Sequence, residues 1–108
     1  LSSSVSGGYY NTASANTASV SGGAGNHASF DSSSVSGGQS NTANGYYASV
    51  SGGFLNRAGC GSACGGGASV SGGHSNTASG WESSVSGGYN PTVTGDFDWT
   101  AGTLFETQ

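Results

Sequence analysis

Basic residues are almost absent from this sequence. Arg57 is the only one, lysine does not occur, and five acidic residues leave a net charge of −4. Binding to nucleic acid needs clustered lysine and arginine side chains that displace counterions from the phosphate backbone. The composition therefore argues against nucleic acid as a partner.

The sequence also lacks the segments that a membrane protein or an enzyme would carry. It contains no apolar run of about 18 residues, so no membrane insertion is expected. No nucleophile elbow, dinucleotide-binding loop, Walker loop or HExxH pair is present. Cys60, Cys64 and His74 match no common zinc spacing. We therefore expect no catalytic activity, no metal site and no cofactor.

Large apolar side chains are too few to build a thick core. Glycine supplies 22 of the 108 residues, and charged residues make up only 6%. An aperiodic chain of this composition would be a flexible linker or a disordered segment. This chain is periodic, and the periodicity predicts a folded repeat protein.

The repeated unit is the pentapeptide SVSGG, and its six copies begin at Ser4, Ser19, Ser34, Ser49, Ser69 and Ser84. The period is 15 residues, with one interval of 20. Fifteen residues are too few for a two-helix repeat, and paired glycines break helices, whereas this length suits one turn of a β-solenoid. We predict an all-β fold, a β-solenoid of about seven 15-residue coils, over residues 1–93.

Side chains alternate between the two faces of each predicted strand, and this alternation indicates which residues face the interior of the solenoid. In Ser-Val-Ser the valine faces inward and the serines face outward. In a second strand around Asn-x-Ala, the asparagine and alanine share the inward face, where stacked amides can hydrogen-bond from coil to coil. The glycine pair supplies a positive φ at the corner. The predicted interior ladder consists of Val5, Val20, Val35, Val50, Val70, Val85, Asn11, Asn26, Asn41, Asn56 and Asn76.

One coil, residues 49–68, is five residues longer than the others and holds both cysteines in the stretch GCGSACGGG. The insertion must bulge from a corner, because the strand patterns on either side are intact. Two thiols four residues apart in a glycine-rich loop predict a local disulfide between Cys60 and Cys64. Such a disulfide fits an oxidising, extracellular setting.

Serine occupies both positions beside the valine in all six copies, whereas the corner residues vary freely. We interpret this restriction as a close, flat contact with another chain, where larger side chains would clash. Economical β-turn packing and a surface carrying O-linked sugar are the alternatives.

From residue 94 the repeat gives way to TGDFDWTAGTLFETQ. We expect residues 94–108 to form either a cap over the last coil or a segment that docks on a neighbouring subunit. At the other end, Leu1 leads into an open coil edge without a signal peptide, which suggests a processed chain or a fragment. The residues predicted for assembly or capping are Leu1, Phe97, Trp99, Leu104 and Phe105.

Aromatic residues gather at the two predicted corners of the coil. Tyr46, Tyr47 and Trp81 fall at the corner opposite the glycine pair. Exposed rings of this kind stack on sugars or become buried in a subunit interface, so these three residues are candidates for contact with a ligand.

Ice binding is a further possibility for a polar solenoid, and it requires a regular column of threonine. Here the column that contains Thr12, Thr42 and Thr77 is interrupted by His27 and Arg57. The serine columns are regular, but serine lacks the methyl group of threonine. Ice binding is therefore the weakest of the functional interpretations.

The unit SVSGGxxNxASG, seen best in SVSGGHSNTASG at residues 69–80, resembles the YadA-like head repeats of trimeric autotransporter adhesins. It is also similar to Ser/Gly/Asn-rich repeat proteins of bacterial surfaces that end in an Asp-Trp-x-Ala-Gly-x-Leu-Phe tail, here residues 98–105. The resemblance covers the whole chain. It implies a left-handed β-roll, display outside the cell and often a trimeric assembly.

Together these features predict a structural subunit of an extracellular or cell-surface filament or fibre. The subunit would associate with copies of itself through its serine columns and terminal segments. The alternative is the head module of a bacterial surface adhesin that binds carbohydrate or matrix, and the second alternative is an ice-binding solenoid. The expected partners are copies of the chain itself and glycans.

Overall fold

The chain folds as a β-solenoid of about six turns. A computed structural model describes residues 2–60, 66–102 and, for the backbone, 104–106. Most strands are only two residues long, because a corner interrupts the extended chain twice in every coil, and one of these corners contains the glycine pair. The strands of the described residues are β1 (Ser4–Val5), β2 (Thr12–Ala13), β3 (Ser19–Val20), β4 (His27–Ala28), β5 (Ser34–Val35), β6 (Thr42–Ala43), β7 (Ser49–Val50), β8 (Arg57–Ala58), β9 (Ser69–Val70), β10 (Thr77–Ala78), β11 (Ser84–Val85), β12 (Thr92–Val93), β13 (Trp99–Ala101) and β14 (Leu104–Glu106).

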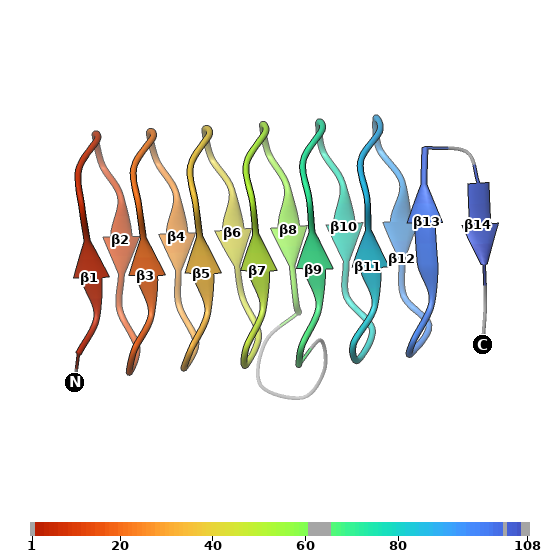
Figure 1. Ribbon diagram of the computed structural model, residues 1–108, viewed down its shortest axis with the longest axis horizontal. Helices are drawn as coiled ribbons and strands as arrows, with labels where there is room; N and C mark the ends of the chain where they lie inside the picture. Colours follow the sequence, from red (N-terminus) through yellow and green to blue (C-terminus); the bar gives the residue numbers. More distant parts are fainter. Residues whose placement is uncertain (1, 61–65, 103, 107–108) are drawn as a thin grey trace.

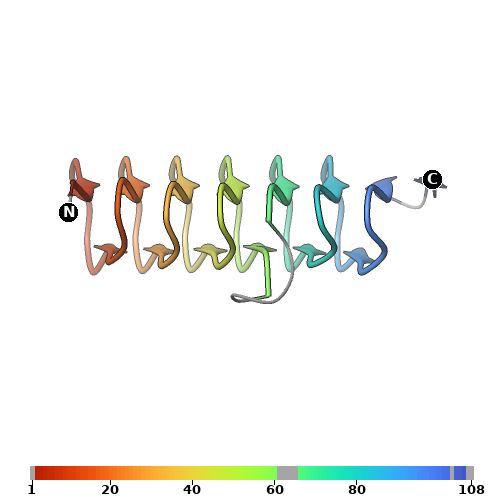
Figure 2. The ribbon, with the colours of Figure 1, turned by 90° about the horizontal axis from the view of Figure 1, so that it is seen from below.

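Successive strands alternate between two sheets that face each other (Figure 1, Figure 2). The odd-numbered strands and β14 form an eight-stranded sheet, and the other even-numbered strands form a six-stranded sheet. Neighbouring strands pair in parallel at the register of the repeat, so that Val20 aligns with Val35. In Figure 1 the odd strands run upward in front and the even strands run downward behind as the chain advances to the right, so the coil is left-handed.

The five additional residues of the long coil lie between β8 and β9 and do not disturb the register. Ser49 aligns with Ser69, and Arg57 aligns with Thr77. Cys60 is disulfide-bonded. Cys64, its predicted partner, lies outside the described residues, so this pairing stays a prediction.

Valine and alanine fill the space between the two sheets. The valines of β3, β5, β7, β9 and β11 are at most 1% exposed, and the alanines of β4, β6, β8 and β10 are fully buried. Val5 is the exception in the predicted ladder, because its side chain is 44% exposed. The assignment of Val5 to the interior is therefore corrected: among the described residues β1 has a strand on one side only, so no second coil there covers this valine.

Asparagine forms a second interior ladder, in which each amide bonds to backbone groups rather than to another amide. Nδ2 of Asn41 donates to the carbonyl oxygens of Gly37 (2.9 Å) and Gly53 (3.0 Å), and Oδ1 accepts the backbone N–H of Asn56 (2.9 Å). Asn26, Asn41, Asn56 and Asn76 are buried, and Asn11 in the first coil is half-buried. The amides of Asn26, Asn41 and Asn56 thus each tie a glycine corner to the next coil.

The two glycines of the pentapeptide have different roles. Gly38 has a φ of +85°, and a Cβ atom there would collide with the carbonyl oxygen of Gly53 and lie 2.5 Å from Nδ2 of Asn41. At Gly37, apart from the residue itself and its chain neighbours, no atom of the described residues lies within 4 Å of the corresponding Cβ position. A positive φ was expected of the pair, and the structure requires it of the second glycine.

The solenoid path continues past residue 94. β13 pairs in parallel with β11, and Thr100 (3% exposed) occupies the place of the interior valine, beside Val85. The chain then reverses, and β14 pairs antiparallel to β13, so a seventh coil begins but is not completed. Among the described residues, β14 is the last strand of the eight-stranded sheet, whereas the six-stranded sheet ends at β12.

The asparagine ladder ends at Pro91. Oδ1 of Asn56 accepts the backbone N–H of Asn76 (2.9 Å), but the corresponding oxygen of Asn76 is buried without a hydrogen-bond partner among the described residues. Pro91 follows Asn76 by one repeat and has no backbone N–H to donate. The proline thus leaves one acceptor in the interior unsatisfied.

Replacing Pro91 with asparagine is expected to raise the free energy of unfolding by about 1 kcal/mol, because it restores the missing donor. Pro91→Ala restores the N–H without the amide, so it should stabilise the protein less. Thermal unfolding followed by circular dichroism measures both variants. A lower melting temperature for both would mean that the rigid proline contributes more than the missing hydrogen bond costs.

Candidate binding surfaces

The outward side of the eight-stranded sheet carries two columns of serine that run along the solenoid axis. One column consists of the serine before each valine, within the strand, and is mostly half-buried. The other consists of the serine after each valine and is exposed. Because the strands pair at the repeat register, each column advances by one serine per coil. We call this surface the serine face, which consists of Ser4, Ser19, Ser34, Ser49, Ser69, Ser84, Ser6, Ser21, Ser36, Ser51, Ser71 and Ser86.

Most hydroxyls of the serine face are not engaged within the chain. Of these serines, all of them described, only Ser86 uses its hydroxyl in a hydrogen bond, where it accepts from Nε1 of Trp99 (2.9 Å). Trp99 stands beside Ser84 in the next strand, so its indole group marks the C-terminal end of the serine columns. The surface is therefore narrow, regular and rich in free hydroxyl groups.

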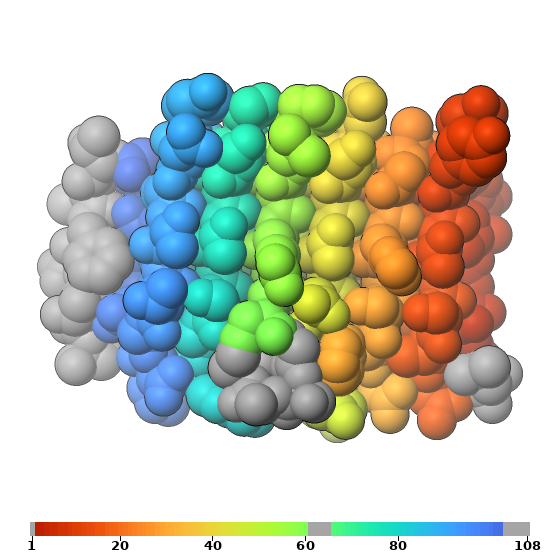
Figure 3. Space-filling model, turned by 180° about the vertical axis from the view of Figure 1, so that it is seen from behind, coloured from red at the N-terminus to blue at the C-terminus, as the bar shows by residue number. Residues whose placement is uncertain are grey.

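The outward side of the six-stranded sheet is less uniform. His27 and Arg57 are both exposed and align in register with the threonines on either side of them. Figure 3 views this side of the molecule, on which the successive coils lie as parallel bands. The threonine column is therefore interrupted twice by larger side chains.

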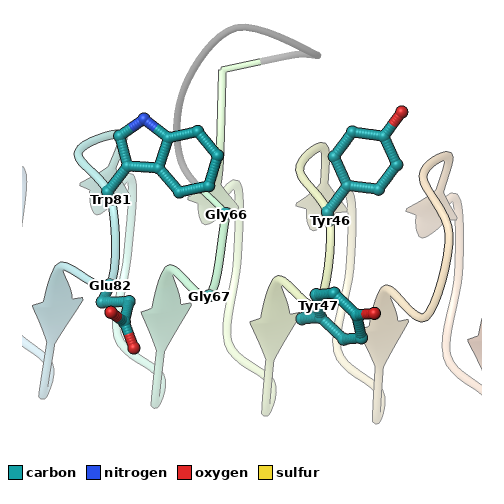
Figure 4. Close-up of a pocket in the computed structure, with 6 residues that line it drawn as sticks. All are labelled: Tyr46, Tyr47, Gly66, Gly67, Trp81 and Glu82. Carbon is teal, nitrogen blue, oxygen red and sulfur yellow. The ribbon is translucent and has the colours of Figure 1, made fainter.

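A cleft lies near the middle of the solenoid. It is formed at the row of corners where the chain passes from an even-numbered strand to the next odd-numbered strand. It has an open shape and a volume of about 490 Å³. Figure 4 shows Tyr46 and Trp81 side by side along one edge, with the glycines between the tyrosine and tryptophan coils. We call it the aromatic cleft, lined by Tyr46, Tyr47, Gly66, Gly67, Trp81 and Glu82.

Three successive coils supply these residues at equivalent positions, one pair from each coil. The backbone N–H of Gly67 donates to the carbonyl oxygen of Tyr46 (2.7 Å), and that of Glu82 donates to the carbonyl oxygen of Gly66 (2.8 Å). The middle pair has no side chains, so the outer pairs form the walls of the cleft and the glycines form its floor.

The three predicted aromatic residues therefore meet in one site, but Gly66, Gly67 and Glu82 were not predicted as part of it. The sequence does carry a signal for them. Tyr46, Gly66 and Trp81 are separated by 20 and then 15 residues, which are the intervals between the neighbouring copies of SVSGG. Once the five inserted residues are allowed for, the three residues occupy the same position of successive repeats and therefore lie in one column.

Another group of rings lies at the glycine corner. The imidazole of His74 lies between the rings of Phe54 and Tyr89, with centroid separations of 4.9 Å on each side. Coil-to-coil alignment produces this stack, because the three residues pair through successive isolated β-bridges. Among the described residues, no three His, Cys, Asp or Glu side chains are placed to hold a metal ion.

The residues predicted for assembly or capping are only partly described. Phe97 is 55% exposed at a corner, and Trp99 is half-buried over the serine face. Leu104 and Phe105 belong to β14, but their side chains lie outside the described residues, as does Leu1.

Comparisons of the chain with protein-family models, with curated proteins and with solved structures find no match. The described residues contain no helix of the length and apolarity needed to cross a membrane.

Proposed function

We propose that this protein is a structural subunit of an extracellular filament or fibre, and that it assembles through its serine face. The main support is the free hydroxyl array described above, in which no side chain larger than serine occurs from β1 to β11. A second chain can approach such a surface closely, and its own polar groups can bond to the unused hydroxyls. The disulfide at Cys60 fits an extracellular setting.

The serine columns occupy only part of one broad side of the molecule, and the size of that side limits how two subunits can pair. The molecule measures 35 Å by 24 Å across this side, which gives an outline of about 840 Å². A stable interface of standard size covers about 800 Å² on each partner. One contact of standard size would therefore cover nearly the whole side, whereas two partners that each overlap half of it would make two contacts of about half the standard size.

The repeat makes a staggered overlap possible. Because the serine face repeats with every coil, a partner displaced by a whole number of coils meets the same pattern of hydroxyl groups. A staggered pair leaves half of each face free for the next subunit, so the contact can propagate into a fibre. The exposed ring of Phe97 and the last strand of the six-stranded sheet, β12, offer further contacts at the C-terminal end.

The test is electron microscopy of the purified chain at several concentrations, together with a double variant, Ser49→Gln with Ser51→Gln. The wild-type protein is expected to form long, uniform fibres. The variant should fold but need at least about tenfold more protein to assemble, because two larger side chains at the centre of the face prevent close approach.

The matched control is Thr42→Gln with Thr77→Gln, which places the same side chains on the six-stranded sheet. This control should assemble like the wild type. Fibres that form equally well from the serine variant, or compact wild-type particles that never elongate, would contradict the proposed assembly.

The alternative function, an adhesin head that binds carbohydrate or matrix, depends on a different surface. Its support is the meeting of Tyr46, Tyr47 and Trp81 in the aromatic cleft. Ice binding has less support, because the exposed side chains of His27 and Arg57 break the threonine column.

A further inference from the structure

The aromatic cleft is a preformed site in which the rings of Trp81 and Tyr46 each pack against a neighbouring residue. The indole of Trp81 lies against Gly66, where a Cβ atom would come within 2.7 Å of Cε3 of the indole. The ring of Tyr46 is held by an edge-on contact with Phe30, at a centroid separation of 5.3 Å. The backbone N–H of Trp81 is also fixed by Oδ1 of Asp96 (2.9 Å). A ligand would therefore meet rings that are already in place.

The spacing of the rings sets the length of a suitable ligand. Tyr46 and Trp81 stand at equivalent positions two coils apart, which corresponds to about 10 Å along the solenoid axis at about 4.8 Å per coil. Figure 4 shows both rings with a face turned to the same side, on either side of Gly66, and we call this pair of rings the platform. A ligand that covers both rings must be extended, and must present a flat apolar surface at two points.

The surrounding charges restrict the chemistry of that ligand. Glu82 lines the cleft, and Asp31 and Asp96 lie one coil beyond it on either side, in the same column as Tyr46 and Trp81. Three of the five acidic residues thus lie along the axis of the platform, and the cleft contains no basic residue. A negatively charged chain along this edge would be repelled at both ends.

We propose that the aromatic cleft binds an uncharged, extended polysaccharide. Two of its sugar rings stack on Tyr46 and Trp81, while its hydroxyl groups bond to the Glu82 carboxylate and the tyrosine hydroxyls. A pyranose ring offers a flat face of C–H groups for stacking and a rim of hydroxyl groups for hydrogen bonding, which is the combination that this site can satisfy. The proposal is independent of assembly through the serine face, because the two surfaces share no residue.

The first experiment measures depletion of the full chain from solution by microcrystalline cellulose and by chitin, with alginate as a negatively charged probe. Binding to at least one neutral polysaccharide is expected, without binding to alginate. Because stacking does not depend on charge, the binding should persist in about 1 M NaCl, where electrostatic attraction is screened. Failure to bind either neutral polysaccharide, or loss of binding in high salt, would overturn the proposal.

Variants locate the binding. Trp81→Ala and Tyr46→Ala should each weaken it about tenfold or more, whereas Trp81→Phe should retain most of it. Tyr10→Ala is the matched control, because Tyr10 is 80% exposed and lies at the opposite corner. Trp81 is itself 43% exposed, so its replacement should leave the thermal melt close to that of the wild type. Equal binding by all variants would overturn the proposal.

A contact between copies of the chain is the competing use of the cleft, and light scattering distinguishes it. If Trp81→Ala reduces particle mass while polysaccharide binding is unchanged, the cleft is a subunit contact and the proposal is wrong. The Ser49→Gln, Ser51→Gln variant should bind polysaccharide as the wild type does, even where it fails to assemble. The proposal for polysaccharide binding and the proposal for assembly through the serine face can thus be contradicted independently of each other.

Discussion

Replacing Gly38 with alanine is expected to lower the free energy of unfolding by about 3 kcal/mol or more, enough to unfold a marginal protein. The new Cβ atom would collide with the carbonyl oxygen of Gly53 and crowd Nδ2 of Asn41. Both are held by the hydrogen bond between them (3.0 Å), so neither can move without loss of an interior contact. The positive φ of +85° adds backbone strain for any residue with a side chain.

Gly37→Ala is the matched control, since it adds the same methyl group one residue earlier, where no described residue beyond the chain neighbours comes within 4 Å. Its effect on stability should stay within about 1 kcal/mol of the wild type. Chemical denaturation followed by circular dichroism compares the two variants. A similar loss of stability in both variants would show that the close approach of successive glycine corners does not require glycine at position 38.

Replacing Asn41 with aspartate is expected to destabilise the solenoid by about 3–5 kcal/mol at pH 7 and by less at pH 3. The amide of Asn41 is fully buried and donates to two carbonyl oxygens through Nδ2. A carboxylate in this place would put an uncompensated negative charge against those oxygens. A protonated carboxyl group could still donate one of the two hydrogen bonds.

The sign of the pH dependence follows from the pKa of the introduced group. Burial and the facing carbonyl oxygens would raise its pKa in the folded state above the value of about 3.9 in the unfolded chain. The folded state then binds the proton more tightly, so stability is greatest below about pH 4 and falls as pH rises toward the folded pKa. Melting temperatures of variant and wild type at pH 3, 5 and 7 measure the difference.

Asn90→Asp is the control for an added carboxylate, because Asn90 is exposed. Its stability relative to the wild type should not change between pH 3 and pH 7. A pH-independent loss in the Asn41→Asp variant would mean that water reaches the amide, and that the asparagine ladder is not an interior feature.

The sequence predicted the strands and corners of the coil well, because the residue type at each repeat position follows from the local structure there. Valine and alanine recur where a side chain points inward, and glycine recurs where the chain turns, so a period of 15 residues is sufficient to place both strands. The hydrogen bonds of the asparagine amides could not be assigned in the same way. Besides a carbonyl group four residues earlier, Asn41 bonds to a glycine corner twelve residues away in the next coil, and only the stacking of the coils brings these last groups together.

The ends of the solenoid were harder to predict than its middle. Val5 has the same sequence context as Val20, yet one is exposed and the other is buried, because burial depends on coils on both sides. Residues 94–101 have little sequence identity with the repeat, yet their backbone continues the solenoid, and β13 pairs in parallel with β11. The backbone register of the preceding coil guides this segment even where the side chains have changed.

The 15-residue period of valine, asparagine and glycine was enough to predict a β-solenoid, because stacked coils bury a continuous core from few apolar groups. The three aromatic residues of the cleft were also predicted from the sequence. That these residues share one site with Glu82 is visible only in the folded chain. Two of the three coils that supply them are separated by the insertion, and the backbone hydrogen bonds between coils, rather than nearness in the chain, align Tyr46, Gly66 and Trp81 in one column.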